Sequence, residues 1–450
     1  MILDMGTSHF DDSSGGCFDI AHRSVEVQRR RPSVGFDTRW NAIENAPERW
    51  GRNQMKPSDR WATSTPSSSA QKPARRSSSV VLITTERTRG ITSSAKASPL
   101  AGGPNVTPTL PAMRAWLLDD IKGPESLRLG EVDDPSPAPD EVVVDIRVAG
   151  LNHLDVFVTY GLPAPKSFPH IPGADGAGVV AAVGEAVSVW KPGDEVIIHP
   201  SLSCGQCAAC LRDDIVFCKA FTILGERLPG TMAEKIAVPA RSLFPRPASV
   251  DWEVAGSFGL ATATAYRMLS RARLQTGETV LVVGVGGGVS SAAMLIAVAR
   301  GARVFVTSRS PDKIAWALAH GAEAGFDSAG EFSKELRAGA SSGANVVIEN
   351  VGLATWNQSI RSLEPGGRLV VCGATAGNKV ELALPVLWFK QYELIGSTMS
   401  NRSEFEASLA MVADGSVPVP VDRIFQFEEL PEAMARLEAG EQMGKIGLAL

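Results

Sequence analysis

Short apolar runs separated by turn residues dominate residues 113–248. Runs such as Glu141–Val148 and Gly178–Val183 are rich in valine, and turn sequences such as Lys-Pro-Gly-Asp lie between them. Apolar runs of this length, bounded by Gly and Pro, are typical of β-strands. The pattern predicts a small β-barrel-like domain.

Residues 249–387 change to an alternation of strand and helix. Four short apolar runs are separated by helical stretches, at Val280–Val283, Val304–Thr307, Val346–Ile348 and Leu369–Cys372. This alternation predicts a doubly wound parallel sheet of the Rossmann type. Residues 388–450 return to mixed strand and helix, and we expect them to rejoin the first domain. The predicted fold class is α/β, a barrel joined to a Rossmann sheet.

Residues 279–299 form a stretch of 21 residues without a charge, which is long enough to cross a bilayer. A Gly/Ser cluster at its centre separates a β-rich run from a helical run. We interpret the stretch as strand, turn and buried helix, and we expect no membrane association.

Residues 1–112 show no sustained apolar periodicity and are rich in Ser, Arg, Pro and Thr. Such a segment cannot bury enough apolar surface to offset the entropy of ordering, so we predict a disordered extension. Met113 opens a well-formed apolar run, which favours internal initiation. Removal of a transit peptide is the alternative, and ten acidic residues weigh against it.

The net charge of −5 is unevenly distributed along the chain. Residues 1–112 carry 15 Lys and Arg against 10 Asp and Glu, and the remaining residues carry 29 against 39. A mildly acidic main body does not favour nucleic acid as a partner.

Four of the six cysteines lie in one segment with the spacing C-x2-C-x2-C-x7-C: Cys204, Cys207, Cys210 and Cys218. Four thiolates close a tetrahedral shell, so this segment predicts one structural zinc ion per chain. A metal-free lobe and a pair of short disulfides are the alternatives. The first residues show no secretory signal, and we expect a reducing, cytoplasmic compartment, which favours metal over disulfides.

A glycine-rich turn follows the first apolar run of the parallel-sheet region. Backbone N–H groups in such a turn can approach a pyrophosphate, and the following helix N-terminus supplies positive potential. We expect dinucleotide binding at Gly284, Gly286, Gly287, Gly288 and Val289. Ser290 stands where a third glycine is usual, and its small side chain should be tolerated. A tight turn without a ligand is the alternative.

The second apolar run ends in Ser308, Arg309 and Ser310, with Lys313 shortly after. An NAD site usually has Asp or Glu at this position to bind the ribose 2′-hydroxyl. Hydroxyls and two cations suit a 2′-phosphate instead, which predicts NADPH as the cofactor. A solvated surface turn is the alternative.

Together these features resemble the medium-chain dehydrogenase/reductase superfamily, which joins a GroES-like barrel to a Rossmann domain. The matching motifs run from residue 113 to the C-terminus and include Gly150–Asp155, Pro172–Gly178, Lys191–Asp194 and Gly444-Lys445. The resemblance implies that the protein is a homodimer or homotetramer. It also implies four divisions of each chain: a GroES-like catalytic domain at 113–248, its zinc lobe at 204–218, a cofactor domain at 249–387, and a segment at 388–450 that returns to the catalytic domain.

The resemblance also places the ligands of a catalytic zinc where this chain has none. Asn152 stands in place of a Cys, Ala174 in place of a His, and residues 258–264 contain no Cys. A rebuilt metal site could use Asp155, Asp175 and His170. This is the basis of the alternative function, a zinc-dependent alcohol dehydrogenase.

The Asn pattern instead resembles the quinone oxidoreductase and enone reductase branch, where the amide helps hold the nicotinamide and the substrate carbonyl. Asn152 is therefore the first catalytic candidate. Thr264 and Asp155 are the other two catalytic candidates. Thr264 is expected near the nicotinamide or as a helix cap, and Asp155 as a hydrogen-bond centre more than as an acid. His153 is expected against the cofactor pyrophosphate or packed in the protein interior. Phe157 stands where a tyrosine is common, so water is a candidate proton donor.

The predicted function is hydride transfer from NADPH to a quinone, enone or enal without a catalytic zinc. The expected partner is a small carbonyl compound, and neither nucleic acid nor a membrane. A non-catalytic NADPH-binding homologue is a further alternative.

Overall fold

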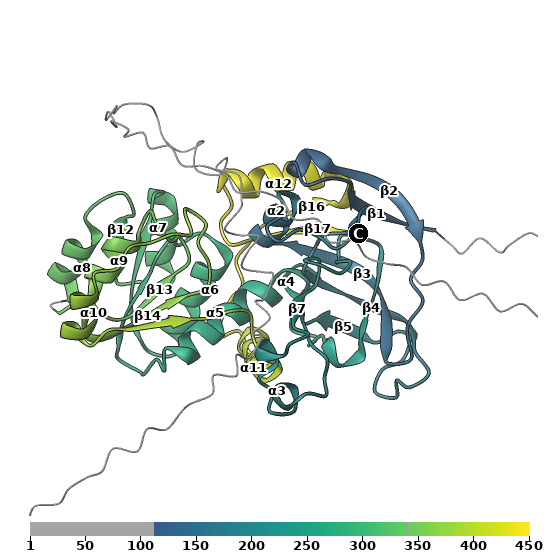
Figure 1. The fold of residues 1–450 in the computed structure, drawn as a ribbon, viewed down its shortest axis with the longest axis horizontal. Helices are drawn as coiled ribbons and strands as arrows, with labels where there is room; N and C mark the ends of the chain where they lie inside the picture. Colours follow the sequence, from purple (N-terminus) through teal and green to yellow (C-terminus); the bar gives the residue numbers. More distant parts are fainter. Residues whose placement is uncertain (1–111, 341) are drawn as a thin grey trace, which may run out of the picture.

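The structure, a computed structural model, describes residues 112–340 and 342–450. It is built on two main sheets that lie side by side (Figure 1). The predicted disordered extension lies outside the described residues except for Ala112, which begins strand β1.

The first sheet is the GroES-like barrel, with strand order β16-β17-β3-β4-β5-β9 and with β8 also paired to β3. Its long central strand β3 pairs antiparallel with both β4 and β17. The pairing with β17 brings the end of the chain back to the barrel. The strands are β3 (Glu141–Leu151), β4 (Asp175–Val183), β5 (Glu195–Ile198), β8 (Lys235–Pro239), β9 (Leu243–Pro245), β16 (Val421–Gln426) and β17 (Lys445–Ala449).

Two small antiparallel pairs accompany this barrel. Strand β1 pairs with β2, and β6 pairs with β7 close to the cysteine segment. Their bounds are β1 (Ala112–Leu118), β2 (Leu127–Asp133), β6 (Ser201–Leu202) and β7 (Thr222–Ile223).

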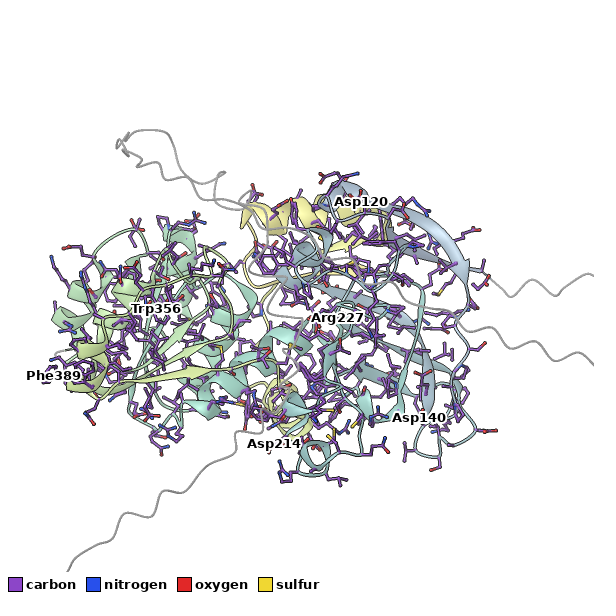
Figure 2. The ribbon with its side chains drawn as sticks, viewed as in Figure 1. Asp120, Asp140, Asp214, Arg227, Trp356 and Phe389 are labelled. Atoms are coloured by element: carbon purple, nitrogen blue, oxygen red, sulfur yellow. The ribbon has the colours of Figure 1, made fainter. Side chains whose placement is uncertain are left out.

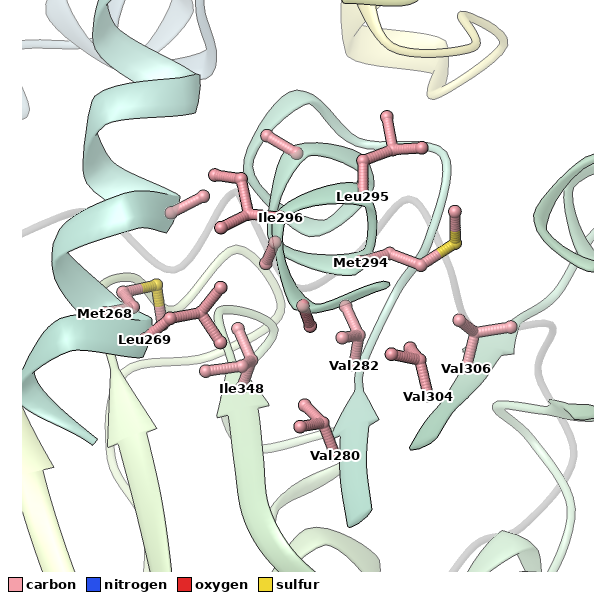
Figure 3. Close-up of a cluster of buried hydrophobic side chains, with 14 of the residues drawn as sticks. Met268, Leu269, Val280, Val282, Met294, Leu295, Ile296, Val304, Val306 and Ile348 are labelled. Carbon is pink, nitrogen blue, oxygen red and sulfur yellow. The ribbon is translucent and has the colours of Figure 1, made fainter. Parts of the chain in front are cut away.

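The second sheet is the Rossmann sheet, with six strands in the order β12-β11-β10-β13-β14-β15, all parallel. Helix α6 lies over its central strands, and its Met294 and Ile296 belong to the same buried cluster as Val282 and Val304 of the sheet (Figure 3). Burial on both faces explains the continuous apolar runs in the sequence. The strands are β10 (Thr279–Val282), β11 (Arg303–Ser308), β12 (Ala324–Asp327), β13 (Ala344–Glu349), β14 (Leu363–Val371) and β15 (Glu393–Gly396).

The helices connect these strands and cover the sheets. They are α2 (His153–Thr159), α3 (Ala208–Leu211), α4 (Trp252–Ser257), α5 (Gly259–Arg271), α6 (Gly288–Ala299), α7 (Pro311–Ala319), α8 (Phe332–Ala340), α9 (Trp356–Ser362), α10 (Leu384–Lys390), α11 (Arg402–Ala413) and α12 (Leu430–Ala439). The uncharged stretch 279–299 is strand β10, the glycine turn and helix α6. Among the described residues, no helix is both long and apolar enough to cross a membrane.

The Rossmann sheet extends further than the boundary at residue 387 that the sequence pattern predicted. Helix α10 is a crossover from β14 to β15, and Leu369 pairs with Leu394 in the last parallel strand. The four-residue run Glu393–Gly396 is too short to be distinguished from a loop by periodicity. The predicted domain boundary at residue 387 is therefore wrong, because it cuts strand β15 off from the Rossmann sheet.

Candidate functional site

The glycine-rich turn links β10 to α6 at the carboxyl edge of the parallel sheet. Gly284 and Gly286 have φ values of 77° and 107°, which favour glycine, and a Cβ at Gly286 would overlap the Lys313 side chain. Gly287 caps α6, and Gly288 and Val289 are its first residues. The first N–H groups of a helix have no intrahelical acceptor. They form a cradle that fits the pyrophosphate of a dinucleotide.

Ser290 fits its position without disturbing the turn. It is fully buried, and its hydroxyl donates to the Val283 carbonyl at 2.8 Å. The Asn350 amide in turn donates to Ser290 Oγ at 2.9 Å. The serine in place of a third glycine therefore ties the turn to the loop after β13.

The end of β11 presents hydroxyls and an exposed cation, and no carboxylate of its own. Ser308 is buried, Arg309 is exposed, and Ser310 caps helix α7. Asp327 of β12 pairs with Ser308 across the sheet, but its carboxylate accepts from the Ala329 N–H in its own turn at 2.9 Å. These residues fit a phosphate on the adenosine ribose.

Lys313 points toward the C-terminal segment. Its ammonium donates to the Gly440 carbonyl at 2.7 Å, and its stem packs against Gly286. Burial lowers its pKa, with a smaller opposing contribution from Asp422. Lys313 thus lies beside the glycine turn, and its contact with a 2′-phosphate stays a prediction.

Asn152 lies in a buried polar cluster where three strands of the barrel converge. The Lys445 ammonium donates to Asn152 Oδ1 at 2.5 Å, to the Leu151 carbonyl at 2.7 Å and to Asp175 Oδ2 at 3.1 Å. Asn152 Nδ2 donates to the same Asp175 oxygen at 3.0 Å. Asp175 Oδ1 accepts from the Leu260 N–H of helix α5 at 2.6 Å. The cluster therefore joins the barrel to the helix that leads into the Rossmann sheet.

Asp155 also belongs to this cluster, and it contacts the backbone of Asn152 and not its side chain. One of its oxygens accepts the Asn152 backbone N–H at 2.7 Å, and the other has no hydrogen-bond partner among the described residues. Burial raises the pKa of Asp155 to about 7, against the lowering effect of that hydrogen bond and of Lys445. This hydrogen bond caps the start of α2, and a wider role of Asp155 as a hydrogen-bond centre stays a prediction.

His153 lies near the two lysines that flank the glycine turn. Burial, followed by the charges of Lys445 and Lys313, lowers its pKa to about 4. The imidazole is therefore neutral at neutral pH and can donate one N–H to a phosphate. Part of its surface is accessible, as a ligand contact requires.

Thr264 lies within α5, one turn after Leu260, and not at the start of a helix as the sequence pattern suggested. The alternative capping role is therefore wrong. Thr264 is 4% exposed, and its hydroxyl has no hydrogen-bond partner among the described residues. Residues four apart share a helix face, so the Thr264 and Leu260 side chains lie on the same face of α5. A buried hydroxyl without a partner is unfavourable.

The four cysteines meet as one ligand set. Their sulfurs lie within 4.8 Å of one another, with closest separations of 3.5, 3.6 and 3.8 Å. A tetrahedral zinc with bonds of about 2.3 Å places its sulfurs roughly 3.8 Å apart, whereas a disulfide needs about 2.05 Å. Backbone N–H groups lower the pKa of Cys204 to about 6, which favours the thiolate. The set fits zinc and not disulfides.

The alternative set for a rebuilt catalytic metal does not assemble. Within residues 112–340 and 342–450, only the cysteines bring three or more Cys, His, Asp or Glu ligand atoms together. His170 is bonded to the Gly225 carbonyl at 2.9 Å, and the Lys445 ammonium lies against Asp175. The local sequence pattern around Lys445 does not reveal this role, because its partners Asp175 and Asn152 are 270 and 293 residues away along the chain.

Two family models match parts of this chain. The alcohol dehydrogenase GroES-like domain family matches residues 138–248, and the zinc-binding dehydrogenase family matches residues 288–414. Acryloyl-coenzyme A reductase of Metallosphaera sedula is 31% identical over 330 residues, covering 72% of this chain and 97% of that protein.

Two solved structures are similar over three-quarters of the chain. An NAD-dependent alcohol dehydrogenase superposes with a TM-score of 0.73 at 37% identity, covering 75% of this chain and 100% of that one. The 2-octenoyl-CoA carboxylase reductase CinF, in complex with NADP and 2-octenoyl-CoA, superposes with a TM-score of 0.70 at 27% identity, covering 75% and 87%.

Proposed function

The chain belongs to the medium-chain dehydrogenase/reductase superfamily and is an oxidoreductase of that type, and from this premise we propose that it reduces an activated alkene or quinone with NADPH, without a catalytic zinc. The activated alkene is one conjugated to a carbonyl group. Acryloyl-CoA and crotonyl-CoA reductases among the relatives support an enoyl thioester as the first substrate to test, beside simple enones, enals and quinones.

One observation carries the proposal. Asn152, which stands where the family resemblance places a zinc-ligating Cys, is hydrogen-bonded to the ammonium of Lys445 and to the carboxylate of Asp175. The Lys445 ammonium therefore already lies beside Asn152, where a zinc ion would bind. Ala174, which stands where the family has a zinc-ligating histidine, has no ligand atom. A catalytic zinc needs about three protein ligands and an open position.

The chemistry required of the chain is orientation and charge stabilisation. Reduced nicotinamide supplies the hydride when it is bound. As the hydride adds to the β-carbon, the alkene electron pair moves toward the carbonyl, negative charge grows on its oxygen, and a proton from water completes reduction at the α-carbon. Asn152 Nδ2 can donate to that oxygen, and Thr264 can orient the ring or the acceptor.

The test is a steady-state panel. We expect turnover with NADPH and at least one of an enoyl-CoA, an enone, an enal and a quinone, and much weaker oxidation of primary or secondary alcohols with NADP⁺. Brief treatment with a mild chelator should leave activity intact, because a closed four-thiolate zinc exchanges slowly. Prompt, zinc-reversible inactivation together with alcohol turnover would establish the alcohol dehydrogenase alternative. Binding of NADPH with no turnover of any compound would establish the non-catalytic alternative.

We also propose a homodimer or homotetramer in the cytoplasm, where a reducing environment favours a metal-bound ligand set such as the four cysteines over disulfides. Helix α10 supports the oligomer. Its sequence Leu-Pro-Val-Leu-Trp-Phe-Lys is almost entirely apolar, yet none of its residues is buried. An all-round apolar helix is normally covered.

The neighbouring strand β15 is an edge of the Rossmann sheet, and among the described strands only β14 pairs with it. A second copy related by a two-fold axis can pair its own β15 antiparallel to this edge and cover both α10 helices. Figure 2 shows Phe389 of α10 at the outer margin of the molecule, on the side away from the barrel.

A further inference from the structure

We propose that Lys445 is a positioning residue for the reaction: its buried ammonium orients the Asn152 amide so that one Nδ2 hydrogen faces the substrate oxygen. The proposal rests on the proposed function and names a residue that acts through Asn152. It assigns to a lysine of the protein the cationic position that a metal holds in zinc-dependent relatives.

Strand register brings the three groups together. Ile446 of β17 pairs with Leu151 of β3, so Lys445 comes opposite Asn152. On the other side of β3, Gly150 pairs with Asp175 of β4. The ammonium and the carboxylate therefore reach Asn152 from two different neighbouring strands. Both side chains are at most 5% exposed.

The ammonium has three hydrogens, and three acceptors use them: Asn152 Oδ1, the Leu151 carbonyl and Asp175 Oδ2. No hydrogen is left for a substrate, so Lys445 does not act as a direct donor. An ammonium can only face the oxygen of an amide, which fixes which end of Asn152 is which.

The remaining Asn152 hydrogens are then assigned by geometry. One Nδ2 hydrogen goes to Asp175, and the second makes no bond within the described part of the chain. A cation on Oδ1 polarises the amide and strengthens its N–H donors. Without the cation, the amide can rotate by half a turn and present its oxygen to the substrate, where it would repel the developing negative charge.

The test compares Lys445→Met with a second variant that keeps the charge balance. Lys445→Met alone leaves a buried carboxylate without its cation and can lower stability. Lys445→Met combined with Asp175→Asn removes both charges. In the double variant, the side-chain amide at position 175 has an NH₂ group that can donate. This favours the rotated form of Asn152, in which Oδ1 faces position 175. Lys191→Met is the control, since that lysine side chain is 81% exposed.

The measurements are kcat and KM with the best substrate, the NADPH dissociation constant without substrate, the melting temperature, and the isotope effect with NADPH deuterated at C4. Losing one oriented donor typically lowers kcat by about 10²–10³. We expect kcat to fall at least tenfold in both variants, with a larger isotope effect and with NADPH affinity and KM within about threefold of wild type. The double variant should recover most of the melting temperature but not kcat.

Three results would overturn the proposal. The first is an unchanged kcat in Lys445→Met. The second is a loss of NADPH affinity that matches the loss of activity, which would make Lys445 a cofactor ligand. The third is recovery of kcat together with stability in the double variant, which would make its role structural. A wild-type enzyme that turns over none of the panel compounds is a separate outcome, and it refutes the proposed function itself.

Discussion

At the scale of single residues, the two buried carboxylates beside Asn152 differ because their partners differ. Asp175 receives an ammonium, an amide N–H and a backbone N–H, so its charge is well compensated. Asp155 accepts the Asn152 backbone N–H, and its other oxygen has no hydrogen-bond partner in the part of the chain that the structure describes. Burial dominates for Asp155, and its pKa rises to about 7.

This difference predicts a pH effect on stability. The folded protein holds the Asp155 proton more tightly than the unfolded chain does, so wild type loses stability as pH rises from about 4 to about 7, by up to about 1.4 kcal/mol per pH unit. Asp155→Asn keeps an oxygen for the Asn152 N–H and removes the titration. We expect the melting temperature of wild type minus that of Asp155→Asn to decrease as the pH is raised from 5 to 7.5.

The control is Asp194→Asn. Hydrogen bonds from Lys191 lower the pKa of that exposed Asp194 carboxyl, so its contribution has the opposite sign and is lost as pH falls. Parallel pH profiles for wild type and Asp155→Asn would show that Asp155 does not titrate in this range.

Cofactor choice is also decided by single residues, at the end of β11. Arg309→Ala should weaken NADPH and leave NADH nearly unchanged, because the guanidinium can form charge-assisted hydrogen bonds to a 2′-phosphate. Such bonds contribute roughly 1.5–3 kcal/mol, which corresponds to about ten- to a hundredfold in affinity. Calorimetric titration of wild type and Arg309→Ala with NADPH and with NADH measures these affinities. Arg303→Ala, at the start of the same strand, is the control. Preference of wild type for NADH, or equal weakening of both cofactors, contradicts the NADPH prediction.

At the scale of elements, the cysteine lobe is attached to the rest of the molecule through helix α11. Asp213, between the third and fourth cysteine, accepts the backbone N–H groups of Arg402 and Ser403 at 3.1 and 2.9 Å. Helix α11 in turn binds Arg267 of α5 through Glu404 at 2.6 Å. The lobe therefore supports the helix that carries Thr264, at a distance from the cofactor turn.

The cysteine lobe, the proposed zinc site, should matter for stability more than for turnover. Cys207→Ser replaces one thiolate with a weaker ligand, and metal binding by such lobes is coupled to their folding. We expect loss of zinc by elemental analysis and a lower melting temperature, by about 2–4 °C for each kcal/mol lost. Activity per folded molecule should fall less. The adjacent exposed residue gives the control, Gln206→Ala. A variant that keeps its zinc and its melting temperature but loses activity would contradict a structural role.

At the scale of the whole molecule, exposed apolar side chains gather around one end of the Rossmann sheet. They come from α10, β15 and the loops beside them: Leu353, Val380, Leu384, Val386, Trp388, Phe389 and Leu394. A groove of about 320 Å³ lies next to them, lined by residues such as Leu353 and Trp356. Monomeric proteins rarely leave contiguous apolar patches of more than a few hundred Å² exposed.

This patch gives a test of the proposed oligomer. Phe389 is 78% exposed, and Phe389→Asp would place a charge in the dimer contact at no cost to the isolated chain. We expect wild type to sediment at a multiple of 47.6 kDa and Phe389→Asp to sediment as a monomer at micromolar concentration. Val189→Asp, at an apolar position that is 74% exposed outside the patch, should keep the wild-type mass. An oligomer that survives Phe389→Asp would place the interface elsewhere.

The sequence by itself determined the features whose residues are close together along the chain. The cysteine spacing predicted a ligand set that the structure brings together, and the Gly284–Val289 turn predicted a phosphate cradle between a strand and a helix. The alternation of apolar runs predicted the parallel sheet. Each of these depends on contiguous backbone geometry, so local pattern is sufficient.

Tertiary structure alone decided the features that depend on strand register and on exposure. Lys445 meets Asn152 because β17 pairs with β3 across nearly 300 residues of sequence, and no local pattern encodes that pairing. Thr264 proved to be inside α5, since helix boundaries depend on what the helix packs against. An apolar run such as α10 has the same sequence pattern whether it is buried or exposed, because burial is a property of the folded surface and not of the residues themselves.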